Sequence, residues 1–253
     1  MDKQIVRTGL FIKKANLTQV EFRDYWHYHH AAIASGMAGM MKYDQNHVVK
    51  KVNLRTIPST GRECDGMSQI WFESMNSQRS NDPETMNRLA IDEHILFQTM
   101  DLVVCETVNY CEMVPGTPFI KYMCFAKKAE NISEQEYAEK LEAAARSILS
   151  IPACIEYRAG NVVERLICNA QGDRSGSAAD EKTYAHPSWM SASYEDVPID
   201  SLLEIYFRFS DKTAIGDPFD NPEGNAALEK LHEIFSEVSC YITDVQHIVN
   251  KYI

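Results

Sequence analysis

The pattern of apolar and polar positions along the chain predicts eight strands and four helices. The strands are expected near residues 5–13, 43–51, 67–74, 102–110, 119–127, 155–164, 201–209 and 241–249. The helices are expected near residues 19–37, 83–100, 134–150 and 222–238. The order strand, helix, strand, strand, helix, strand therefore occurs twice along the chain.

The two halves also resemble each other in sequence. Residues 11–22 read FIKKANLTQVEF and residues 125–137 read FAKKAENISEQEY. Each segment carries a hydroxyl residue three positions before a glutamate, which is the pattern of a capping box at a helix start. The two pairs are Thr18 with Glu21 and Ser133 with Glu136. We therefore expect an internal repeat whose copies begin their first helix in the same way.

Each copy has the element order of a ferredoxin-like βαββαβ unit, with its helices on one face of a four-stranded sheet. The other sheet face would be bare, so we expect the two sheets to close on each other as an α+β barrel. The predicted domains are residues 1–111, which carry the site, and a degenerate copy at 119–253. A polar insertion at about 165–199 interrupts the second copy and is either a lid or a surface loop.

Composition excludes several classes of protein. The chain has 253 residues and a formal net charge of −11. This acidic balance disfavours nucleic-acid binding, and no apolar stretch is long enough to cross a membrane. The start lacks the apolar core of a signal peptide, and the seven cysteines show no C-x-x-C pair. We expect a cytoplasmic protein with reduced cysteines, which could still form a homo-oligomer.

Helix one concentrates imidazoles. In an ideal helix Trp26 and His29 share the apolar stripe, and His30 lies at its edge. The second copy has Ala144 and Ala145 where the first has His29 and His30. Because the second helix packs on alanine there, the imidazoles of the first copy are candidates for chemistry rather than packing.

Four further residues join this candidate site. Tyr43 and His47 share one face of the second strand, and His47 becomes Asn161 in the second copy. Asp92 and Glu93 lie on helix two among apolar neighbours, where a carboxylate needs a partner. A buried carboxylate beside an imidazole is a common arrangement for general acid–base chemistry.

Several stretches of the first copy resemble the EthD-like family of dimeric α+β barrel proteins. They are Phe11–Lys14, Leu17-Thr18, Phe22–Trp26, His30, Tyr43–His47, Asp65-Gly66, Trp71-Phe72 and Asp92-Glu93. The family has a proline two residues after the helix histidine, whereas Ala32 stands here. The resemblance selects His30 over His29, and the tandem layout is also similar to bacterial chalcone isomerase.

The resemblance implies cofactor-free chemistry on small aromatic compounds. We predict a lyase or isomerase that uses His and Asp acid–base catalysis on an aromatic, phenolic or polyketide-like substrate. The alternatives are a cofactor-free or haem-assisted monooxygenase and a non-catalytic binding module. We expect no metal and no resident cofactor. The predicted catalytic residues are His30, His47 and Asp92, and the predicted substrate-binding residues are His29, Tyr43, Trp26, Glu93 and Trp71.

Overall fold

A computed structural model describes residues 3–74, 83–168, 173–175, 184–185, 199–209 and 217–251. The strands of the first half are β1 (Lys3–Lys13), β2 (Met40–Val52), β3 (Gly66–Phe72) and β4 (Phe97–Cys111). Its helices are α1 (Gln19–Tyr25), the π-helix η1 (Trp26–His30), α2 (Ala31–Ala34) and α3 (Pro83–Leu96). The second half has β5 (Phe119–Lys128), α4 (Glu134–Leu149), β6 (Cys154–Cys168), β7 (Asp173–Ser175), β8 (Tyr184–Ala185), β9 (Ser201–Arg208), α5 (Pro222–His232) and β10 (Phe235–Asn250).

Eight of the described strands close into one antiparallel barrel. The strand order is β4-β1-β3-β2-β10-β5-β9-β6, and an additional pairing of β4 with β6 joins the ends. The junctions between the two halves are therefore β2 with β10 and β4 with β6. This closure confirms the predicted α+β barrel.

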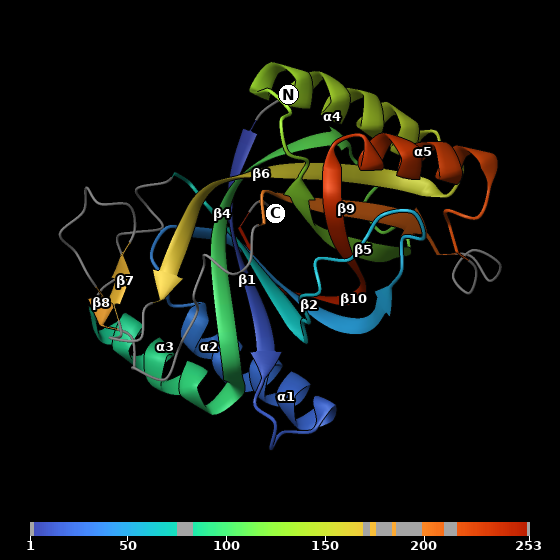
Figure 1. The fold of residues 1–253 in the computed structure, drawn as a ribbon. Coiled ribbons are helices and arrows are strands. Elements are labelled where there is room, and N and C mark those ends of the chain that lie inside the picture. Colours follow the sequence, from blue (N-terminus) through green and yellow to red (C-terminus); the bar gives the residue numbers. More distant parts are fainter. Residues whose placement is uncertain are drawn as a thin grey trace.

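The helices cover the outside of the barrel on opposite sides. Helices α1, α2 and α3 lie on one side and α4 and α5 on the other (Figure 1). Apolar clusters fill the layer under each group of helices. A separate cluster, which includes Leu10, Met67 and Phe125, fills part of the barrel interior. Each helix layer thus provides its own space between helices and sheet in which a site could form.

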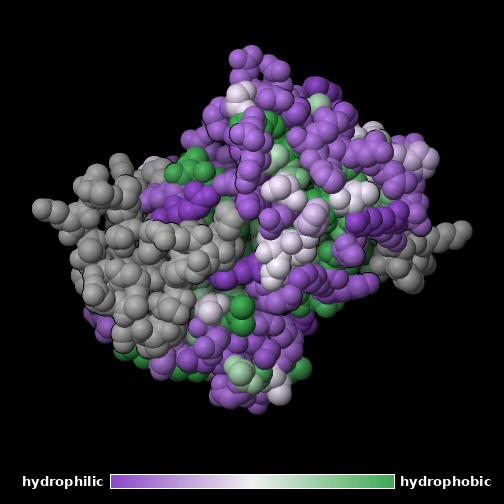
Figure 2. All heavy atoms as spheres, viewed as in Figure 1, coloured by the Kyte–Doolittle hydropathy of each residue, from purple (hydrophilic) through white to green (hydrophobic). Residues whose placement is uncertain are grey.

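The described surface is mostly hydrophilic on the face shown in Figure 2. The exposed large apolar side chains lie on different elements, for example Val20 on α1, Val49 on β2 and Val114 after β4. None of the helices in the described ranges is long and apolar enough to cross a membrane.

The expected helix starts are present. Thr18 accepts a hydrogen bond from the Glu21 N–H, and the Glu21 carboxylate accepts from the Thr18 N–H, which completes the capping box. Ser133 likewise accepts from the Glu136 N–H at the start of α4. Sequence spacing was sufficient here because both partners of a cap lie within one turn.

Two helices end earlier than the sequence predicted. Helix α3 stops at Leu96 and α5 at His232, because β4 and β10 begin almost at once with the fully buried Phe97 and Phe235. Strand β4 pairs with β1 on one side and β6 on the other, and its pairing with β1 reaches Phe97. Strand pairing in the barrel therefore includes residues whose local sequence pattern is also compatible with a helix.

The predicted polar insertion at about 165–199 lies mostly outside the described residues. Within it, β6 continues to Cys168 and pairs with β7, which pairs with β8.

The barrel interior holds a buried ion pair that the sequence analysis did not anticipate. Lys121 Nζ lies 2.7 Å from Glu204, and both side chains are almost fully buried. Gln69 accepts from Lys121 and donates to Glu204. Burial alone would raise the pKa of Glu204, but the charges of Lys121 and Arg158 lower it to about 2. Glu204 is therefore a carboxylate.

Candidate active site

A π-turn sets which histidine of the first helical segment faces the protein interior. In η1 the Ala31 N–H donates to the Trp26 carbonyl, five residues earlier, instead of four. The extra residue rotates the following side chains relative to an ideal helix. His30 is consequently buried and His29 is exposed, the reverse of what the ideal helical stripe predicts.

His30 is held by a carboxylate from α3. Its Nδ1 lies 2.7 Å from Asp92 Oδ2, and the Tyr25 hydroxyl donates to Asp92 Oδ1 at 2.9 Å. Burial, together with the hydrogen bond and charge of Asp92, raises the pKa of Tyr25 to about 12. Because a carboxylate accepts hydrogen bonds, the neutral imidazole carries its proton on Nδ1 and has its lone pair on Nε2.

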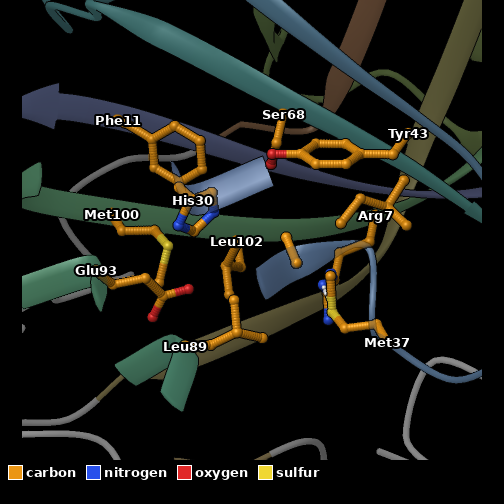
Figure 3. A pocket seen from close by; sticks show the side chains of 12 residues that line it. Arg7, Phe11, His30, Met37, Tyr43, Ser68, Leu89, Glu93, Met100 and Leu102 are labelled. Carbon is orange, nitrogen blue, oxygen red and sulfur yellow. Dashed lines mark hydrogen bonds between the residues drawn. The ribbon is translucent and has the colours of Figure 1, made fainter. Parts of the chain in front are cut away.

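A small pocket lies beside His30, between the helices and the outer face of the sheet. Its lining residues are Arg7, Phe11, His30, Ala34, Met37, Tyr43, Ser68, Ile70, Leu89, Glu93, Met100 and Leu102. The cavity bounded by these side chains measures about 20 Å³, which is enough for about one water molecule. His30, Tyr43 and Glu93 reach it from different elements (Figure 3).

Charged and polar groups are few in this pocket, and they are buried. Arg7 is 7% exposed, its Nη2 lies 3.0 Å from Met37 Sδ, and its guanidinium lies 5.2 Å from the centre of the Phe72 ring. Glu93 is 6% exposed. Burial raises the pKa of Tyr43 above its usual range, so this hydroxyl keeps its proton. The arrangement combines an imidazole, two hydroxyl groups, a cation and a carboxyl group with apolar side chains in one buried pocket.

His47 lies in a different place. It lines a more open groove of about 180 Å³ together with Arg23, Asp24, His27, Tyr28, Asp244 and Gln246. Burial and the nearby charge of Arg23 lower the pKa of His47 to about 4. The prediction that His47 and a histidine of the first helix face one cavity is wrong, because His30 and His47 line two separate cavities.

The two tryptophans predicted to bind substrate, Trp26 and Trp71, also lie in different places. Trp26 is fully buried between the sites, with its ring 4.6 Å from the His47 ring and 5.5 Å from the Phe11 ring. Trp71 alternates with Ile70 along β3 and so lies on the opposite strand face from the pocket. Its ring contacts Lys42, whose Nζ lies 4.3 Å from the ring centre.

The structure thus brings together four of the residues proposed from the sequence, namely His30, Asp92, Tyr43 and Glu93. It places His29, His47 and Trp71 away from this pocket. Sequence reasoning missed Arg7 and Tyr25. The signal for Arg7 was a charge inside the apolar strand IVRTGLF, whereas Tyr25 had no signal before its contact with α3 was known.

The described part of the chain contains no cluster of side chains suited to hold a metal ion. No three His, Cys, Asp or Glu side chains there converge closely enough to hold an ion.

Comparisons with known proteins place the fold. The EthD domain family matches residues 14–97. No curated protein matches the chain. Similar solved structures include an anthrone oxidase-like protein, with 12% identity and a TM-score of 0.56 over 99% of this chain and 95% of that one. A candidate monooxygenase from Lactobacillus acidophilus has 7% identity and a TM-score of 0.53 over 99% and 97%. Another, from Fusobacterium nucleatum, has 8% identity and a TM-score of 0.53 over 96% and 92%.

These neighbours correct the lyase or isomerase prediction. The three structures are named for an oxidase or a monooxygenase, and none of the three is named for a lyase or an isomerase. At this low identity the structural likeness shows a shared fold and says nothing about a substrate. The resemblance found in the sequence is confirmed: residues 14–97 match the EthD domain family, within a chain that shares the α+β barrel fold of these structures.

Proposed function

We propose that the chain is an oxygenase for small aromatic compounds that carry an acidic CH₂ group conjugated with a carbonyl oxygen. The observation that carries the proposal is the His30–Asp92 pair, because it holds an imidazole at a buried pocket with its lone pair on the nitrogen that Asp92 does not contact. The names of the structural neighbours support oxygen chemistry over isomerisation.

The proposed reaction begins with a proton transfer. His30 Nε2 takes the proton from the acidic carbon, and the substrate becomes an enolate. The enolate carbon then forms a bond to dioxygen, and the proton returns to give a hydroperoxide. Loss of water breaks the O–O bond, removes the second hydrogen from that carbon and leaves a new carbonyl group. One dioxygen is consumed and one water is released for each substrate molecule.

A single-ring or larger substrate requires the pocket to open. Met37, Met100 and Leu89 form part of its wall, and unbranched thioether chains adapt to a ligand at low cost. A haem does not fit beside His30, because the cavity there measures about 20 Å³ and a porphyrin would separate the helices from the sheet. The proposed mechanism therefore uses no haem step.

Oxygen uptake with anthrone tests the proposal. The wild-type chain should consume dioxygen, and His30→Gln should lower kcat by about 10²–10⁴-fold, the usual contribution of a general base. His29→Gln is the matched control, because it removes a neighbouring but exposed imidazole. Absence of uptake by the wild-type chain, or equal effects of the two substitutions, would contradict the proposal.

We also propose that the two halves are ferredoxin-like copies, 1–111 and 119–253, and that only the first carries the site. The supporting observation is that the positions of His29 and His30 correspond to Ala144 and Ala145, which are both buried in the second helix layer. The aligned positions of the second half therefore carry no imidazole.

A further inference from the structure

The orientation of one buried amide determines what Tyr43 presents to the pocket. Gln45 is fully buried on β2, two residues after Tyr43 and two before His47. Its Nε2 lies 2.8 Å from the Trp26 carbonyl oxygen and 2.9 Å from the Tyr43 hydroxyl, and its Oε1 lies 3.2 Å from His47 Nε2. A carbonyl oxygen can only accept, so the amide nitrogen must face Trp26, and this fixes the whole side chain.

The imidazole of His47 agrees with this orientation. Because burial keeps His47 neutral, its ring carries one N–H group. This group is Nε2–H, which donates a hydrogen bond to Gln45 Oε1. Both ends of the amide are therefore satisfied in only one way, with oxygen toward His47 and nitrogen toward Trp26 and Tyr43.

The direction of the Tyr43 hydroxyl follows. Its oxygen accepts a hydrogen bond from Gln45, so its own hydrogen points elsewhere. Tyr43 is fully buried, and its side chain lines the pocket together with His30. The cavity is large enough for about one water molecule, so an oxygen atom inside it, of water or of a substrate, can accept this hydrogen bond.

We propose that Tyr43 donates a hydrogen bond to the substrate oxygen that becomes the enolate, and that Gln45 holds Tyr43 in this role. This inference rests on the proposed oxygenase function. His30 supplies the base and Tyr43 the donor, so the pocket selects compounds in which a carbonyl oxygen is conjugated with the carbon that loses its proton, such as anthrone. Arg7 and Glu93 line the same pocket with opposite effects, since the positive charge of Arg7 favours an anion there and the negative charge of Glu93 opposes it.

The effect of Tyr43 should be large because the hydrogen bond strengthens as the oxygen becomes charged. Removing one such donor from an oxyanion site costs about 10²–10³-fold in kcat. Tyr43→Phe should therefore lower kcat for anthrone oxidation by about this factor. Gln45→Met should lower kcat less and leave KM near its wild-type value, because the hydroxyl remains but is no longer held.

The second half offers a matched control. Tyr157 corresponds to Tyr43 in the aligned copies, is fully buried, and has a hydroxyl without a recorded partner. Tyr157→Phe deletes the same atom from another fully buried tyrosine, on the side of the barrel without His30. It should leave oxygen uptake unchanged.

Binding of 4-nitrophenol separates this inference from the proposed function, since it needs no turnover. Its ionised form absorbs at longer wavelength, so absorbance reports which form the protein binds. We expect the wild-type chain and Tyr157→Phe to favour the ionised form, and Tyr43→Phe to lose at least about 10-fold of that preference. Gln45→Met gives a second reading if Tyr43→Phe does not fold.

The outcomes are distinct. A Tyr43-dependent preference for the ionised probe without oxygen uptake would leave the inference standing and remove the oxygenase proposal. Oxygen uptake that Tyr43→Phe leaves unchanged would overturn the inference and leave the oxygenase proposal standing. No binding of the probe by the wild-type chain, or equal losses in Tyr43→Phe and Tyr157→Phe, would overturn the inference.

Discussion

Acid should destabilise this protein partly through His47, and substitution of that residue should remove the effect. The side chain is 3% exposed, and burial with the charge of Arg23 lowers its pKa from 6.5 to about 4. In the unfolded chain His47 regains its ordinary pKa and binds a proton first. The unfolded state therefore gains stability as the pH falls from about 6.5 to about 4.

The size of the effect follows from the two pKa values. Their difference corresponds to about 3 kcal/mol of unfolding free energy, present in full above the unfolded pKa and lost as the pH falls through the folded one. About 2 kcal/mol should be lost between about pH 7 and about pH 4.5.

Urea unfolding at several pH values measures this contribution. The comparison is between wild type and His47→Asn, which carries the residue found at the aligned Asn161 of the second half. The two proteins have all other titrating groups in common, so the difference between their unfolding free energies isolates His47. That difference should change by about 2 kcal/mol between about pH 7 and about pH 4.5, and a difference that stays constant would refute the reasoning.

Three further substitutions test the packing and the site. Gly66→Ala should cost about 1–3 kcal/mol in urea unfolding, because a Cβ there would lie 2.4 Å from Trp26 Cζ3. Lys121→Met should cost about 3–5 kcal/mol because it strands the Glu204 carboxylate, and the double substitution with Glu204→Leu should recover most of the loss. Asp92→Asn should lower kcat for anthrone oxidation by about 10²–10⁴-fold, and the ¹⁵N shifts of the His30 imidazole should report whether its proton has moved to Nε2. A kcat unchanged by Asp92→Asn would show that the carboxylate does not orient the base.

The strands, the helix starts and the barrel could be predicted because each depends on local sequence signals. The capping box at Thr18 is complete within one turn, and the bare sheet faces required closure. The helix ends were less predictable, since Phe97 and Phe235 are claimed by strand pairing with distant residues.

The site was only partly predictable for a similar reason. Ideal helical geometry favoured His29, and a single π-turn at Trp26 brings His30 inward instead. The pairing of His30 with Asp92 joins residues 62 positions apart, so only the fold could establish it. Lys121 stood in an apolar strand, but its partner Glu204 lies on another strand of the barrel.

The most direct test of the account is anaerobic mixing with anthrone, which isolates the proton transfer from the reaction with oxygen. The wild-type chain should produce the long-wavelength absorbance of the enolate without oxygen, and this absorbance should disappear when oxygen is admitted. His30→Gln should produce little or none of it, whereas His29→Gln should match the wild type. Equal enolate formation by all three proteins would contradict the claim that His30, held by Asp92, is the base of this site.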